Sequence, residues 1–161
     1  LGELCYIHPR IEAPLLPAKL LFGAAGGQVP VVRPAEALAL YYNVMAANRE
    51  GLIRSSHDLS DGGLAVALAE ITFGTGLGLA VAVDGVAASA VSALYSESHS
   101  RFVVTVRPEH CARFEEILGA AAVRIGETTA APRLRIGWQG RPLLDCAGAE
   151  LEQAWQKELL S

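Results

Sequence analysis

The chain has 161 residues, of which 52% are hydrophobic and 19% charged. This length and composition indicate one folded domain and exclude a disordered chain. The net charge is -4 and the thirteen Lys and Arg form no basic run, which argues against a nucleic-acid-binding surface. The three cysteines, Cys5, Cys111 and Cys146, include no CxxC pair. We therefore expect no zinc site, no disulfide framework and a cytoplasmic protein.

Proline and glycine punctuate residues 1–30, which predicts an irregular N-terminal arm before a folded domain over 31–161. Because the first residue is Leu1 and not Met, we expect a piece of a longer polypeptide. Pro34 predicts the start of a helix that ends near Gly51. Along this helix the apolar side chains of Leu38, Tyr41 and Met45 recur at helical spacing. Residues 52–56 then predict a short strand.

The next stretch, SHDLSDGGL (56–64), is followed by a run whose only charge between Gly62 and Val83 is Glu70. Its length would allow a membrane span. Glycines at 74, 76 and 78 interrupt the run, and Glu70 would lie near the middle of the bilayer. We therefore predict no membrane span. Instead, a buried helix should contain Leu64, Leu68 and Ile71, followed by a glycine turn and a strand, LAVAV, buried on both faces.

The remaining elements alternate between helices and strands. We expect a short helix near 87–94, a strand at 101–106, a helix from Pro108, and strands in AAVRIGE, LRIGW and RPLL. The helix from Pro108 should bury Cys111, Phe114 and Leu118, and the last helix should bury Leu151, Trp155 and Leu159. The alternation predicts a mixed sheet with helices packed on it.

The SHDLSDGGL stretch suits a phosphate and a metal ion at a strand-to-helix junction. Ser60 or Asp61 stands where an N-cap belongs. Gly62 and Gly63 would leave backbone N–H groups uncovered at the positive end of the helix dipole. Asp58 and Asp61 would repel bare phosphate but would accept one carried with magnesium. In the alternative interpretation, Asp-Gly-Gly is a turn with an N-cap, and His57 bonds inside it.

A second polar cluster, YSESHSRF (95–102), precedes the 101–106 strand. Glu97 and Ser98 could hydrogen-bond a substrate, and Arg101 could bind a phosphate or pair with Glu97. The alternative is a structural loop held by a Glu97–Arg101 ion pair. The residues alone leave both interpretations open.

Three segments in this order, HDLSDGGLAVALAE, YSESHSRFVVTV and RIGETT, resemble the C-terminal part of phosphoribosylformylglycinamidine synthases of the large-subunit type. Those enzymes belong to an ATP-dependent superfamily that includes aminoimidazole ribonucleotide synthetase and a hydrogenase maturation factor. The resemblance spans roughly residues 30–160. The start is less similar: LGELCY has Glu3 and Leu4 where the family has glycine and serine. The resemblance implies an α+β fold, an α/β/α sandwich with a mixed sheet that is partly ferredoxin-like.

The resemblance also implies a function. In the family, ATP activates the formamide oxygen of formylglycinamide ribonucleotide, and ammonia displaces the phosphate to give the amidine. A glutamine amidotransferase domain or subunit supplies the ammonia, and an ATP-binding domain is the other partner. By the same resemblance Asp58 would hold Mg²⁺, and Glu97, Ser98 and His99 would contact the substrate. His99 replaces the family's glutamine, and this chain looks like the later of two such domains.

Three interpretations follow. The chain is a synthase domain that is inactive alone, a non-catalytic scaffold domain of the same enzyme, or a kinase-like relative. SDGGL and SESHSR disfavour the last. A domain taken from a larger enzyme should expose apolar surface, so we also expect self-association as a symmetric dimer.

Overall fold

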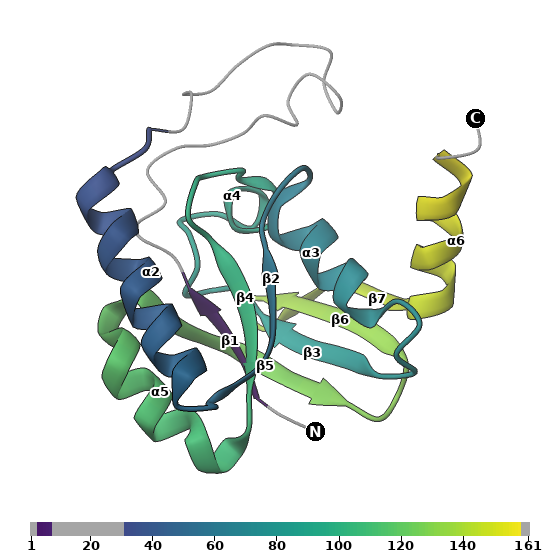
Figure 1. Ribbon diagram of the computed structural model, residues 1–161. Helices are drawn as coiled ribbons and strands as arrows, with labels where there is room; N and C mark the ends of the chain where they lie inside the picture. The colour runs from purple at the N-terminus through teal and green to yellow at the C-terminus, as the bar shows by residue number, and fades with distance from the viewer. Residues whose placement is uncertain (1–2, 8–30, 159–161) are drawn as a thin grey trace.

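The computed structural model describes residues 3–7 and 31–158, which form a mixed sheet with helices on both faces (Figure 1). In chain order the strands are β1 (Glu3–Ile7), β2 (Ile53–Asp58), β3 (Gly78–Ala82), β4 (Phe102–Val106), β5 (Ala122–Thr129), β6 (Arg133–Trp138) and β7 (Arg141–Ala147). The α-helices are α2 (Pro34–Arg49), α3 (Gly63–Thr72), α4 (Ala90–Tyr95), α5 (Cys111–Leu118) and α6 (Gly148–Glu158). Two 3₁₀ turns, η1 (Pro108–His110) and η2 (Gly119–Ala121), flank α5.

The strand order is β2-β4-β1-β5-β3-β6-β7. The β3–β6 pair is parallel, and the other neighbouring pairs are antiparallel. The predicted mixed sheet is therefore confirmed. The strand β1 corrects the expectation of an irregular arm over all of 1–30. Residues 3–7 pair with β4 and β5 on either side, with Cys5 opposite both Val104 and Arg124. A short strand between two neighbours is stabilised by long-range pairing, which local sequence patterns do not reveal. Residues 8–30 lie outside the described part.

Two apolar clusters lie on opposite faces of the sheet. Val103 and Val104 are adjacent in β4, so their side chains point to opposite faces. Val103 belongs to the cluster under α3 and α4, whereas Val104 belongs to the cluster under α2 and α5. This division confirms helical layers on both sides of the sheet. Cys111, Phe114 and Leu118 of α5 are buried in the second cluster, as predicted.

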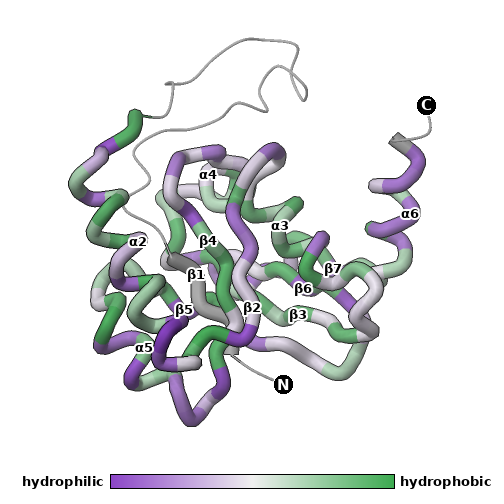
Figure 2. The backbone as a smooth tube through the Cα atoms, in the orientation of Figure 1, coloured by the Kyte–Doolittle hydropathy of each residue, from purple (hydrophilic) through white to green (hydrophobic). Residues whose placement is uncertain are grey.

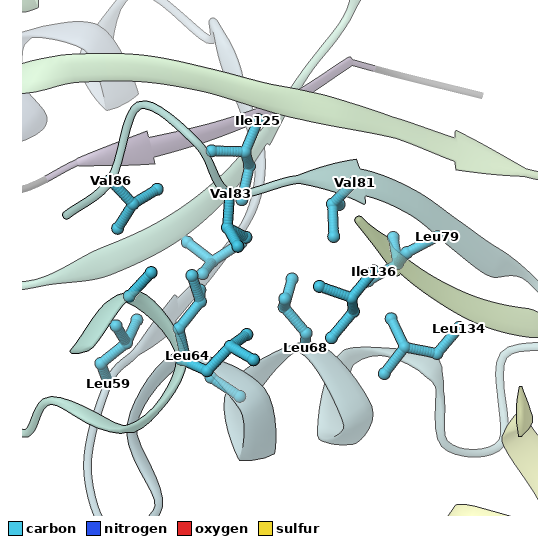
Figure 3. Packing of buried hydrophobic residues seen from close by; sticks show 14 residues of the cluster. Leu59, Leu64, Leu68, Leu79, Val81, Val83, Val86, Ile125, Leu134 and Ile136 are labelled. Atoms are coloured by element: carbon cyan, nitrogen blue, oxygen red, sulfur yellow. The ribbon is translucent and has the colours of Figure 1, made fainter. Parts of the chain in front are cut away.

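The larger cluster fixes α3 on the sheet. Leu64 and Leu68 are completely buried, and Leu68 lies beside Ile136 of the sheet (Figure 3). Burial of each leucine stabilises the fold by about 1.5–3 kcal/mol. Figure 2 shows that apolar residues dominate α3 and the neighbouring strand β3. Across residues 3–7 and 31–158, no helix is both long and apolar enough to span a bilayer.

Two burial expectations are corrected. The strand at 79–83 is not buried on both faces, because Ala82 is exposed. Trp155 is 45% exposed and packs on Phe73 at the surface, with ring centroids 5.9 Å apart. In α2 the apolar spacing of Leu38, Tyr41 and Met45 marks an exposed stripe. The buried residues of that helix are instead Ala37, Leu40 and Ala47.

Candidate functional site

The SHDLSDGGL stretch forms a strand-to-helix junction, as its sequence predicted. Strand β2 ends at Asp58 and α3 begins at Gly63. Between them, the Leu59 N–H donates to the carbonyl oxygen of Arg101 at 3.0 Å. Leu59, the first residue after β2, therefore connects the junction to the second polar cluster.

The N-cap of α3 is Gly62, not Ser60 or Asp61. Gly62 has φ 81°, in the left-handed region that favours glycine. With this backbone turn, the Ser60 hydroxyl does not cap the helix and instead donates to Asp58 Oδ2 at 2.7 Å. The Ser60 carbonyl accepts from the Gly63 N–H at 3.0 Å.

Gly63 lets the two polar clusters pack backbone against backbone. A Cβ at this position would lie 2.8 Å from the carbonyl oxygen of Leu94 and 2.9 Å from that of Ser96. Its φ of 63° is also unfavourable for residues with a side chain. The doubled glycine is thus required by close packing, independently of any ligand.

Glu97 connects the clusters a second time. Its Oε1 accepts from the Gly62 N–H at 2.9 Å. The amides of Gly62 and Gly63 were expected to be uncovered, but both are hydrogen-bonded within the chain. The sequence identified the two clusters separately, and the structure brings them together at the first turn of α3.

Arg101 is a buried residue that holds the loop before β4. It is 1% exposed, and its guanidinium donates to the carbonyl oxygens of Ser96 at 2.5 Å and Ala93 at 3.4 Å. Burial lowers the pKa of Arg101 to about 9, so the side chain is still charged at neutral pH. These two hydrogen bonds of Arg101 are with backbone atoms, as is the bond of Glu97 with the Gly62 N–H. Arg101 therefore stabilises the loop before β4 from inside the fold.

His57 has a partner that sequence reasoning missed. Its Nδ1 lies 2.6 Å from the Asp58 carbonyl oxygen, and its Nε2 lies 3.2 Å from Glu70 Oε2 on α3. A carbonyl only accepts, so the Nδ1 N–H donates to Asp58, and Nε2 faces the Glu70 carboxylate. The available signal was that Glu70 is the only charge in the apolar run.

Asp58 is exposed at the end of β2. The Ser60 hydroxyl, the backbone amide of Asp58 and the charge of His57 together hold the pKa of this carboxyl below its usual range. Such a carboxylate can act as one magnesium ligand. The described residues contain no group of three or more His, Cys, Asp or Glu side chains placed to hold a metal. They fit Mg²⁺ only if ligand phosphates and water complete its coordination.

The remaining predicted residues lie on the 96–100 loop. Ser98 Oγ is 2.8 Å from Ser96 Oγ, and His99 is exposed. Ser100 has φ 60°, and its hydroxyl lies 2.8 Å from the Tyr41 hydroxyl of α2. Tyr41 thus belongs to this region although its sequence position gave no such indication.

Two of the cavities lined by described residues border the sheet. One, of about 700 Å³, is lined by His57 and by residues of β2, β4 and the end of α3. The other, of about 710 Å³, lies over β5, β3, β6 and β7 and contains none of the predicted site residues.

The solved structures that this chain resembles are longer than the chain. Phosphoribosylformylglycinamidine synthase II from Thermotoga maritima has a TM-score of 0.75 and 20% identity, covering 93% of this chain and 25% of that chain. A structure described as T. maritima PurL complexed with FGAR has a TM-score of 0.70 and 24% identity, over 76% of this chain and 22% of that chain. The hydrogenase maturation protein HypE, in complex with ATP, has a TM-score of 0.56 and 20% identity, over 66% and 40%.

This chain therefore spans about a quarter of the length of the PurL chains that it resembles. At these identities the likeness establishes the fold. A family model, AIR synthase related protein, C-terminal domain, matches residues 14–139, which is more than half of the chain. The superfamily expected from the sequence is thereby confirmed, and the chain belongs to the AIR synthase related protein family as a C-terminal domain.

Proposed function

We propose that the chain is the C-terminal domain of a phosphoribosylformylglycinamidine synthase, which converts formylglycinamide ribonucleotide to the amidine with ATP. One observation carries the proposal: the two motifs that resemble the synthases meet through the Gly62–Glu97 hydrogen bond and the packing of Gly63. The similar PurL chains have been solved with FGAR and with ATP, which supports the same ligand classes here.

In this proposal the exposed polar groups around the junction face the ligand. Asp58 supplies a carboxylate to Mg²⁺ that arrives with a phosphate-bearing ligand. Ser98 and His99 lie on the adjoining loop and supply hydrogen-bonding groups to the substrate. Ser60 hydrogen-bonds Asp58 and positions that carboxylate, and Glu97 hydrogen-bonds Gly62 and positions the N-terminus of α3.

An ATP-binding domain and a source of ammonia complete the enzyme. Both are partners outside this chain: the remainder of the synthase and a glutamine amidotransferase domain or subunit. The 161-residue chain alone is expected to be inactive, because one quarter of the length of similar synthases cannot supply those parts.

A scaffold role is the second candidate, and a specific observation favours it. The Gly62 and Gly63 amides and one Asp58 oxygen are already bonded within the chain. A ligand is not needed to satisfy these groups. In that case the junction would only hold α3 on the sheet.

The experiment uses the full-length protein that carries this domain, supplied with ATP, magnesium, ammonia and formylglycinamide ribonucleotide. We expect amidine formation, and a loss of about tenfold or more in kcat/KM for His99→Ala with an unchanged melting temperature. His99 is exposed, so this substitution should not disturb packing. Absence of amidine product from a folded, ammonia-supplied protein would reject the synthase assignment. Normal activity of the His99 variant would support the scaffold role.

A further inference from the structure

The 700 Å³ cavity between β2, β4 and the end of α3 is lined by charged residues that have no role in the proposed function. Two arginines, Arg54 and Arg107, line it together with a single carboxylate, Glu109. Threonine and serine hydroxyls form one part of its wall, and Ile71, Leu77 and Leu79 form another. A cavity of this size suits a small molecule. The two guanidinium groups would repel a cation and attract an anion, so a charged ligand of this cavity should be an anion.

A β-bulge places Arg54 in this cavity. Strands β2 and β4 pair Ile53 with Val106 and Ser55 with Thr105, so Arg54 is an extra residue between two pairs. A bulge redirects the side chain of the strand that contains it. Arg107 directly follows the last residue of β4 and enters the cavity from the neighbouring strand.

Arg54 and Arg107 differ from several other arginines of the domain in that their guanidinium groups have no carboxylate partner among the described residues. Arg113, Arg124 and Arg133 each lie within 2.9 Å of a carboxylate oxygen. Within the described ranges, no ion pair or hydrogen bond involves the guanidinium group of Arg54 or of Arg107. Their donors are available for an anion, and a guanidinium matches phosphate oxygens in geometry.

A hydroxyl pair beside Arg54 provides a further donor. Ser55 Oγ and Thr105 Oγ1 lie 2.6 Å apart, and Thr105 is 8% exposed. In such a pair one hydroxyl donates to the other, and the accepting hydroxyl still has its own proton to donate. An oxygen-rich anion in the cavity can accept that proton.

We infer that this cavity binds a phosphorylated small molecule that has an apolar portion. The phosphate lies against Arg54, Arg107 and the Ser55–Thr105 hydroxyls, and the apolar portion contacts Ile71 and Leu77. This site adjoins the Asp58 junction and shares Ser56 and His57 with it, but its two arginines come from the start of β2 and from the residue after β4, and Asp58 does not line it.

The test uses the 161-residue chain with two probes, inorganic phosphate and phenyl phosphate, and isothermal titration calorimetry. We expect phenyl phosphate to bind about tenfold more tightly than phosphate. Arg54→Gln and Arg107→Gln should each weaken both probes by about tenfold or more. Leu77→Ala should weaken phenyl phosphate but not phosphate. Arg54, Arg107 and Leu77 are all exposed, so these variants should stay folded, and circular dichroism checks this.

Arg49→Gln is the matched control, because Arg49 is an exposed arginine at the end of α2 outside the cavity. This variant should bind both probes as the unaltered chain does. The inference is overturned if the unaltered chain binds neither probe, or if Arg49→Gln weakens binding as much as Arg54→Gln. It is also overturned if binding persists in both cavity variants but is lost in Asp58→Asn, which would place the phosphate at the junction. Because the readout is binding by the isolated chain, failure here leaves the synthase proposal unaffected.

Discussion

Replacement of Gly63 by alanine tests whether the doubled glycine exists for packing between the two polar clusters. An alanine Cβ would lie 2.8 Å and 2.9 Å from two backbone carbonyl oxygens, which cannot move away as a flexible side chain could. Such overpacking costs about 1–3 kcal/mol. The left-handed backbone, with φ 63°, adds about 1–2 kcal/mol for a residue with a side chain. We therefore expect Gly63→Ala to lower the free energy of unfolding by about 2–5 kcal/mol.

Gly74→Ala is the matched control. Gly74 has a similar φ of 65°, but an added Cβ there would meet nothing within 4 Å. Its replacement should therefore cost only the backbone contribution of about 1–2 kcal/mol. Urea unfolding of both variants measures the difference. If the two variants are destabilised equally, the carbonyl contacts of Gly63 do not restrict the side chain and the reasoning is wrong.

Three further predictions concern individual side chains. Glu97→Ala should lower the free energy of unfolding by about 1–2 kcal/mol, because the Gly62 N–H loses its acceptor. Glu97→Gln retains an oxygen and should cost less, and urea unfolding compares the two. Arg101→Met should lower the free energy of unfolding by about 2–4 kcal/mol, because it leaves the carbonyl oxygens of Ser96 and Ala93 without a donor. Urea unfolding measures this change, and a decrease below about 1 kcal/mol would contradict the prediction. Ser60→Ala should raise the pKa of Asp58 toward its usual value, because the hydroxyl bond is the largest cause of the lowering. The lowered pKa stabilises the folded state above the unfolded pKa, and this stabilisation is lost as pH falls through the folded pKa. Carboxyl NMR titration of Asp58 measures the change, and an unaltered titration would contradict it.

Local sequence patterns predicted the mixed sheet, the junction between β2 and α3, and the burial of Leu64 and Leu68. These features depend on residue spacing within one element. The pairing of β1 between β4 and β5 was missed, because it joins residues about 100 positions apart and leaves no local signal. Leu38, Tyr41 and Met45 of α2 recur at helical spacing although they are exposed, so apolar spacing alone does not show which side of a helix is buried.

Only part of the site could be predicted, because contacts between distant segments leave no local signal in the sequence. The sequence showed that SHDLSDGGL and YSESHSR are rich in polar groups, but it could not show that Glu97 accepts from Gly62. It suggested Ser60 or Asp61 as the N-cap, since those residue types favour the position. The cap is instead Gly62, with its positive φ, and the Ser60 hydroxyl bonds Asp58.

In the function that we propose, the junction at Asp58 binds a ligand in addition to stabilising the fold. Isothermal titration calorimetry of the full-length protein, with magnesium and ATP or with formylglycinamide ribonucleotide, tests this for Asp58→Asn against the unaltered protein. Asparagine has nearly the same shape but carries no charge, and Asp58 is exposed, so the melting temperature should not change. The ligand account predicts that affinity for at least one ligand falls by about tenfold or more. Unchanged affinities together with a melting temperature several degrees lower would show that Asp58 only stabilises the turn.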